Sequence, residues 1–233
     1  MKVQHMLPED IERTSMDMIS RKLYERGIVL PEEHAAVVKR VIHTTADFDF
    51  ARNLHFTPNA VGLAKAALFR GVAIVTDTNM AKAGISKSAL AKLGGQVCCF
   101  MADEDVAQTA KEKGTTRAVA AMEKAVKQFP NAVFTIGNAP TALLRIAELI
   151  EEGLRPALVI GVPVGFVNVV ESKEAALAAC QAKGIPAILA MGQKGGSSVA
   201  AAVNRSPSRG QGKNIKFLHS PAGMPGCGKR RFG

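Results

Sequence analysis

The chain has 233 residues, of which 47% are hydrophobic and 21% charged, with a formal net charge of +10. This length and composition fit one globular α/β domain with a real core. No apolar run reaches the roughly 18 residues of a membrane span, and the N-terminal residues lack the apolar stretch of a secretory signal. We therefore expect no membrane partner and a cytoplasmic location.

The sequence up to residue 70 is predicted to be mainly helical. Apolar residues recur at helical spacing over residues 9–26 and 31–44, and a proline followed by two acidic residues marks each start, at Pro8 and at Pro31. A third helix is predicted over residues 58–70. These three helices are expected to pack on the core of the domain.

From residue 72 onward, short β-branched runs alternate with helical segments. Near-continuous apolar strands separated by helices are typical of a parallel sheet that is covered on both faces. The predicted fold class is therefore α/β, a three-layer sandwich with a mostly parallel sheet. The strands are predicted at residues 72–76, 96–101, 132–136, 157–161 and 187–190, and the helices at 86–94, 104–128, 139–152, 171–183 and 196–204.

The C-terminal segment breaks this pattern. Residues 205–233 contain seven basic and no acidic residues, so residues 1–204 are only mildly basic. Residues 206–233 are rich in glycine, proline and serine and have little to bury, which predicts poor order. We therefore divide the chain into a domain, residues 1–205, and a basic tail, residues 206–233. Polyanion or nucleic-acid binding through the tail is an alternative function, but the tail has no recognised motif, so we expect no nucleic-acid partner.

Polar or glycine-rich turns follow four of the five predicted strands. They cover residues 76–79, 137–141, 161–166 and 192–198. Ligands of open parallel sheets bind beyond the carboxyl ends of the strands, so these turns predict a site-sized cluster. Asn138 either contacts a ligand or caps the next helix.

The last of these turns, with Gly195 and Gly196, suits a carboxylate or phosphate because glycine leaves backbone N–H groups accessible. It lacks the spacing GxxxxGK[ST], and no GxGxxG follows a strand, which disfavours an NTPase or a dinucleotide enzyme. The four cysteines show no metal-ligand spacing. We expect neither a cofactor nor a metal, although a generic phosphate-ligand α/β enzyme remains an alternative.

His43 ends the helix predicted over residues 31–44. Arg40 lies one turn earlier, and two threonines and Asp47 follow directly. Such a histidine either complements the helix dipole or exchanges a proton with a substrate near neutral pH. Ser15 on the first helix and Arg117 at a predicted helix start are further candidates, because arginine binds carboxylates through two parallel hydrogen bonds.

Six segments together resemble the precorrin-8X methylmutase family, and its cobalt-precorrin-8 branch in particular. They run in family order over about 200 residues: RVIHTTADFDF at 40–50, VTDTNMAKAGI at 75–85, GTTRAVAA at 114–121, IGNAPTALLRI at 136–146, GVPVGFVNVVESKEAA at 161–176 and MGQKGGSSVAAAVN at 191–204.

The resemblance implies an isomerase that moves a methyl group from C11 to C12 of precorrin-8X or cobalt-precorrin-8. The product would be hydrogenobyrinate or cobyrinate, in cobalamin biosynthesis. It also implies a homodimer without cofactor or metal catalyst. The family's catalytic histidine matches His43. Its substrate-contacting serine and arginines match Ser15, Arg40 and Arg117, to which we add Asn138, Gly195 and Gly196 from the turns.

Two features depart from the family. Gln193 stands where an arginine is common, so one anionic contact is missing or comes from Lys194. The ending from about Arg205 is also unlike the family.

A non-catalytic corrinoid-binding protein is the main alternative, and it would keep its ligand after His43→Ala. Removing residues 206–233 would abolish nucleic-acid binding but leave a methylmutase intact.

Overall fold

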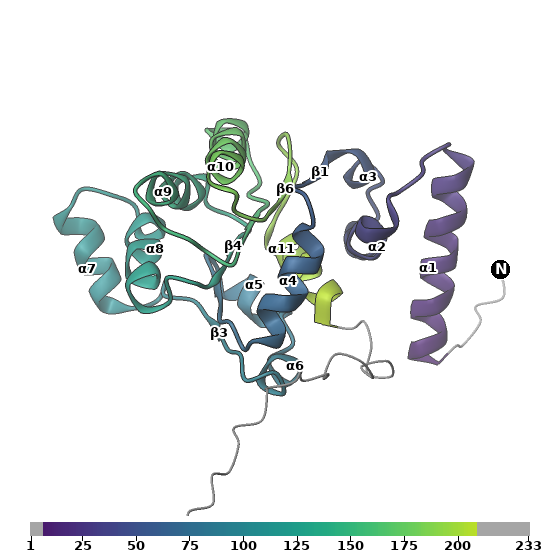
Figure 1. Cartoon of the computed structure of the whole chain (residues 1–233), viewed down its shortest axis with the longest axis horizontal. Coiled ribbons are helices and arrows are strands. Elements are labelled where there is room, and N and C mark those ends of the chain that lie inside the picture. The colour runs from purple at the N-terminus through teal and green to yellow at the C-terminus, as the bar shows by residue number, and fades with distance from the viewer. Residues whose placement is uncertain (1–6, 209–233) are drawn as a thin grey trace, which may run out of the picture.

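Three layers make up the fold, with a six-stranded sheet between two sets of helices (Figure 1). The computed structural model describes residues 7–208, so the predicted tail lies, from residue 209 on, outside the described residues. The strand order is β1-β6-β5-β4-β2-β3, and every neighbouring pair is parallel except β1 with β6. The strands are β1 (Leu54–Phe56), β2 (Ile74–Thr76), β3 (Val97–Cys98), β4 (Val133–Ile136), β5 (Leu158–Gly161) and β6 (Ala187–Ala190).

The predicted mostly parallel α/β sandwich is confirmed, and the helices fall close to their predicted positions. Among residues 7–208, every helix is too short or too polar to cross a lipid bilayer. The helices are α1 (Pro8–Glu25), α2 (Glu32–Thr45), α3 (Phe50–Asn53), α4 (Ala60–Phe69), α5 (Asn79–Gly84), α6 (Lys87–Ala91), α7 (Glu104–Glu112), α8 (Arg117–Gln128), α9 (Pro140–Glu151), α10 (Val169–Lys183) and α11 (Ser197–Ser208).

Side chains point alternately to the two faces of the sheet along each strand, and this alternation divides the core into two clusters. Ile74 and Val133 face α2, α4 and α11, whereas their neighbours Val75 and Phe134 face α8, α9 and α10. Successive strand residues point to opposite faces of a sheet, so a strand covered on both sides is apolar throughout. This double coverage explains why the central strands appear in the sequence as continuous apolar runs.

The segment predicted as one helix over residues 104–128 is two helices. α7 ends at Glu112, and Gly114 takes a φ of +59°, a left-handed conformation that favours glycine. Thr116 then caps α8, because its Oγ1 accepts a hydrogen bond from the N–H of Val119 at 3.2 Å. The break places Arg117 at the start of a helix, as predicted.

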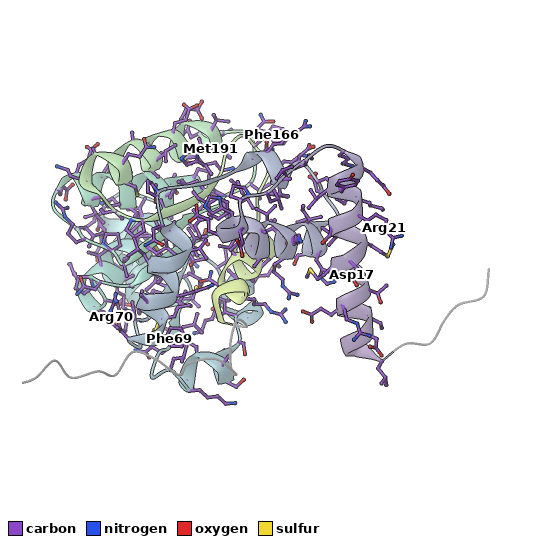
Figure 2. The ribbon with its side chains drawn as sticks, turned by 45° about the vertical axis from the view of Figure 1, so that its right-hand side comes forward. Asp17, Arg21, Phe69, Arg70, Phe166 and Met191 are labelled. Carbon is purple, nitrogen blue, oxygen red and sulfur yellow. The ribbon has the colours of Figure 1, made fainter. Side chains whose placement is uncertain are left out.

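The N-terminal helices lie at one side of the molecule. α1 packs on α2 and buries Ile19 and Leu23, while the rest of its length stands away from the sheet (Figure 1). Figure 2 shows Phe166 and Met191, which follow β5 and β6, at the upper edge of the molecule, with Phe69 and Arg70 at the lower edge. The carboxyl ends of the parallel strands therefore open at the upper edge.

Candidate active site

The four turns predicted to form a site meet at the carboxyl edge of the sheet. The hydroxyls of Thr78 and Ser197 lie 2.8 Å apart and share a hydrogen bond. The N–H of Gly196 donates to the carbonyl of Val162 at 2.8 Å. A Cβ on Gly137 would lie 2.9 Å from the Cα of Ser197. The turns after β2, β4, β5 and β6 are thus in direct contact.

Asp77 organises the turn after β4. Its carboxylate is buried and accepts hydrogen bonds from the N–H groups of Gly137, Asn138 and Ala139, each at 2.8 Å. Burial raises the pKa of Asp77 above its usual value, and the three hydrogen bonds offset only part of this rise. Ala139, not Asn138, is the N-cap of α9. The capping interpretation of Asn138 was therefore wrong, and its exposed side chain stands free at the site edge.

Glycine is required at two positions of the β6–α11 loop, which we define as residues 192–198. A Cβ on Gly195 would overlap the carbonyl oxygen of Val162 and lie 2.5 Å from that of Pro163. Gly196 has a φ of +128°, which residues with a side chain rarely adopt. The loop therefore packs on the β5 turn with its backbone at the open edge, directly before α11.

Lys194 ties this loop to the segment that follows His43. Its ammonium donates to Asp47 at 2.7 Å and to Asp49 at 2.6 Å. The hydrogen bond from Lys194 lowers the pKa of Asp47, and the two carboxylates raise the pKa of Lys194. Lys194 is thus engaged by two carboxylates of its own chain, which disfavours it as a substitute for the arginine that Gln193 replaces.

His43 lies in the last turn of α2, where its exposed side chain lines a hollow of about 270 Å³ with Ser15, Met18 and Lys22 of α1. We call this cavity the His43 hollow. It also has apolar walls, formed by Ile19, Ile42, Ala46 and Phe48. Two of the predicted site residues, one from each N-terminal helix, therefore meet in one place.

The predicted arginines lie in different surroundings. Arg40 donates to Glu12 of α1 at 2.5 Å, a bond that joins the two helices beside the His43 hollow. Arg117 begins α8, where Thr116 shares a 3.2 Å hydrogen bond with Thr141 of α9. α8 and α2 lie at opposite sides of the molecule in Figure 1. One chain therefore does not bring Arg117 to His43.

Comparison with known proteins decides the family. The model of the precorrin-8X methylmutase family matches residues 10–206. This chain belongs to the precorrin-8X methylmutase family. A cobalt-precorrin-8 methylmutase of Priestia megaterium is 42% identical over 196 residues, covering 84% of each chain. One from Salmonella typhimurium is 43% identical over 203 residues, covering 84% of this chain and 92% of its own.

A solved structure agrees with this assignment. The precorrin-8X methylmutase from Thermus thermophilus matches with a TM-score of 0.75 at 35% identity, over 85% of this chain and 96% of its own. The α/β fold of this chain is therefore the fold of a precorrin-8X methylmutase.

Sequence reasoning did not name three further residues of the candidate site individually. Lys22 lines the His43 hollow, and no ion-pair partner for it is found within residues 7–208. Asp77 and Lys173 are buried beneath the turns. Two of the three had a visible signal, since Asp77 directly follows an apolar strand and Lys173 interrupts the apolar positions Val169, Ala176 and Cys180 of α10.

Proposed function

We propose that this chain catalyses the methyl shift from C11 to C12 of precorrin-8X or cobalt-precorrin-8, with His43 as the proton-handling residue. The observation that carries the proposal is the His43 hollow, where an exposed histidine and Ser15 share apolar walls. Lys194 connects the segment after His43 to the glycine-rich β6–α11 loop. Family membership supplies the reaction. The names of the relatives favour the cobalt-bearing substrate.

The reaction is an isomerisation, in which one carbon–carbon bond to the methyl group breaks at C11 and one forms at C12. No atom is gained or lost, so the protein needs neither a nucleophile nor a redox partner. It has to polarise the conjugated ring. A histidine that delivers a proton to the ring system and takes one back suits this task, because imidazole titrates near neutral pH.

Substrate carboxylates require several binding points to fix one orientation of the macrocycle. We assign this role to Ser15, Arg40, Arg117, Asn138 and the backbone at Gly195 and Gly196. Lys22 joins them because its ammonium shares the hollow with His43. A tetrapyrrole is larger than the hollow, whose volume of about 270 Å³ is just below the roughly 300–1,000 Å³ of sites for drug-sized ligands. The ring must therefore extend beyond the cavity.

The first test is an absorption spectrum of the purified protein with cobalt-precorrin-8 and, in parallel, with metal-free precorrin-8X. We expect catalytic conversion to the corresponding cobyrinate or hydrogenobyrinate spectrum, faster for the cobalt-bearing compound. Tight binding of either compound without conversion would point to a corrinoid-binding protein. Failure to bind either compound would overturn the proposal.

We propose further that the active form is a cytoplasmic homodimer and that the catalytic domain spans residues 1–205. Cys98, Cys99 and Cys180 are free thiols, as expected in a reducing compartment. The placement of α8 and α2 at opposite sides of one chain supports a second copy (Figure 1). If Arg117 and His43 serve one substrate, they must come from different protomers, because α8 and α2 are far apart within one chain (Figure 1).

Mixing two inactive variants tests this arrangement. His43→Ala and Arg117→Ala homodimers are dissociated together and reassociated, which gives mixed dimers with one intact site. We expect activity to return to about one quarter of the wild-type value, by the statistics of closed twofold assembly. Mixtures that stay as inactive as the separate variants would show that each site lies within one protomer.

A further inference from the structure

Lys173 occupies a core position of α10. Its side chain is 0% exposed and stands among the apolar positions that pack this helix against the sheet. Within the described part of the chain it is the one buried lysine. Burying an ammonium is unfavourable unless polar groups replace its water, so the position calls for an explanation beyond packing.

Backbone carbonyls, rather than a carboxylate, replace that water. The Nζ of Lys173 donates to the carbonyl of Gly192 at 2.5 Å and to that of Lys194 at 2.9 Å. Within residues 7–208 no carboxylate lies within ion-pair distance of it. Burial lowers the pKa of Lys173 to about 8. The side chain therefore reaches from the core to the β6–α11 loop and holds it from below.

The same loop is held from above by the segment after His43. The side-chain ammonium of Lys194 bonds Asp47 and Asp49, while the backbone carbonyl of Lys194 accepts a hydrogen bond from Lys173. Lys194 thus connects the buried ammonium of Lys173 with the two carboxylates that follow α2. Every link in this series is a charge-assisted hydrogen bond, which is shorter and stronger than a neutral one.

We propose that Lys173 is a positioning residue, which fixes the β6–α11 loop so that its backbone faces the substrate and Lys194 meets the His43 segment. The inference rests on the proposed function, because it assumes that the loop binds the anionic groups of the tetrapyrrole. Gly195 and Gly196 give this loop an open backbone, and a glycine-rich loop without such an anchor would lose order. Lys173 supplies the anchor without occupying the surface.

Lys173→Met tests the inference, since methionine fills similar space but donates no hydrogen bond. The matched control is Lys183→Met, which removes an exposed lysine from the same helix. We expect hydrogen exchange of amides in residues 190–198 to speed up at least tenfold in Lys173→Met and to stay unchanged in the control. We also expect the KM to rise about tenfold with kcat nearly constant, because the loop binds substrate while His43 remains on α2.

A merely structural role gives a different result. Loss of folded protein lowers kcat in proportion and leaves the KM unchanged, and that outcome, or unchanged exchange in residues 190–198, would overturn the inference. Should Lys173→Met not fold, the ¹⁵N spectrum of lysine ammonium groups in the wild-type protein decides. One slowly exchanging ammonium supports the anchoring of the β6–α11 loop by Lys173. The absence of such an ammonium refutes it. Hydrogen exchange and this spectrum need no substrate, so failure of the methylmutase proposal would remain distinguishable.

Discussion

Replacing His43 by alanine is expected to lower kcat/KM by about 10²- to 10⁴-fold, the usual contribution of a general acid or base. His43 is exposed in the hollow that it shares with Ser15, and its truncation leaves the buried neighbour Ile42 in place. The variant should therefore fold normally and bind the tetrapyrrole with an affinity within a few-fold of the wild type. Absorption spectroscopy measures both turnover and binding.

His34→Gln is the matched control on the same helix. His34 stacks on Phe56 with ring centroids 4.0 Å apart and does not line the His43 hollow. Its replacement should leave kcat/KM nearly unchanged. Added imidazole should raise the activity of His43→Ala about tenfold, because the hollow is open to solvent and imidazole replaces the lost acid. If His43→Ala turns over at the wild-type rate, the proton is handled elsewhere.

The sheet was predictable because its central strands are buried on both faces. Residues such as Ile74 and Val75 are apolar in succession, so the run itself marks the strand. β1 carried no such signal. It is three residues long, antiparallel at the sheet edge, and includes His55, so its place depends on pairing with β6 rather than on its own composition. Tertiary pairing of this kind cannot be derived from a local pattern.

The candidate site, like the sheet, could be predicted only in part from the sequence. The turns could be predicted to converge, since parallel strands share one carboxyl edge. The groups that hold the turns together could not, because their partners are distant in sequence. Asp77 bonds residues 60 and more positions away, and Lys194 bonds Asp47 across 147 positions. Sequence spacing gave the candidates, and only the fold showed that Ser15 meets His43 while Arg117 does not.

Of the variants that we propose, Asp77→Asn is expected to lose the most stability. The carboxylate accepts one N–H on Oδ1 and two on Oδ2. An asparagine keeps a single oxygen, so its amide group faces at least one backbone donor that it cannot accept. A buried donor without a partner costs about 1–3 kcal/mol, and the negative charge at the start of α9 adds up to about 1 kcal/mol. The free energy of unfolding should fall by about 1–4 kcal/mol.

Urea denaturation measures this loss, with Asp17→Asn on the exposed side of α1 as the control that should stay within about 0.5 kcal/mol of the wild type. The loss should also reach the site. The N–H of Asn138 is one of the three donors, so the turn that presents this side chain loosens with the carboxylate. The folded variant should then bind substrate more weakly. Unchanged stability in Asp77→Asn would mean that water satisfies these donors, and that Asp77 does not organise the turn.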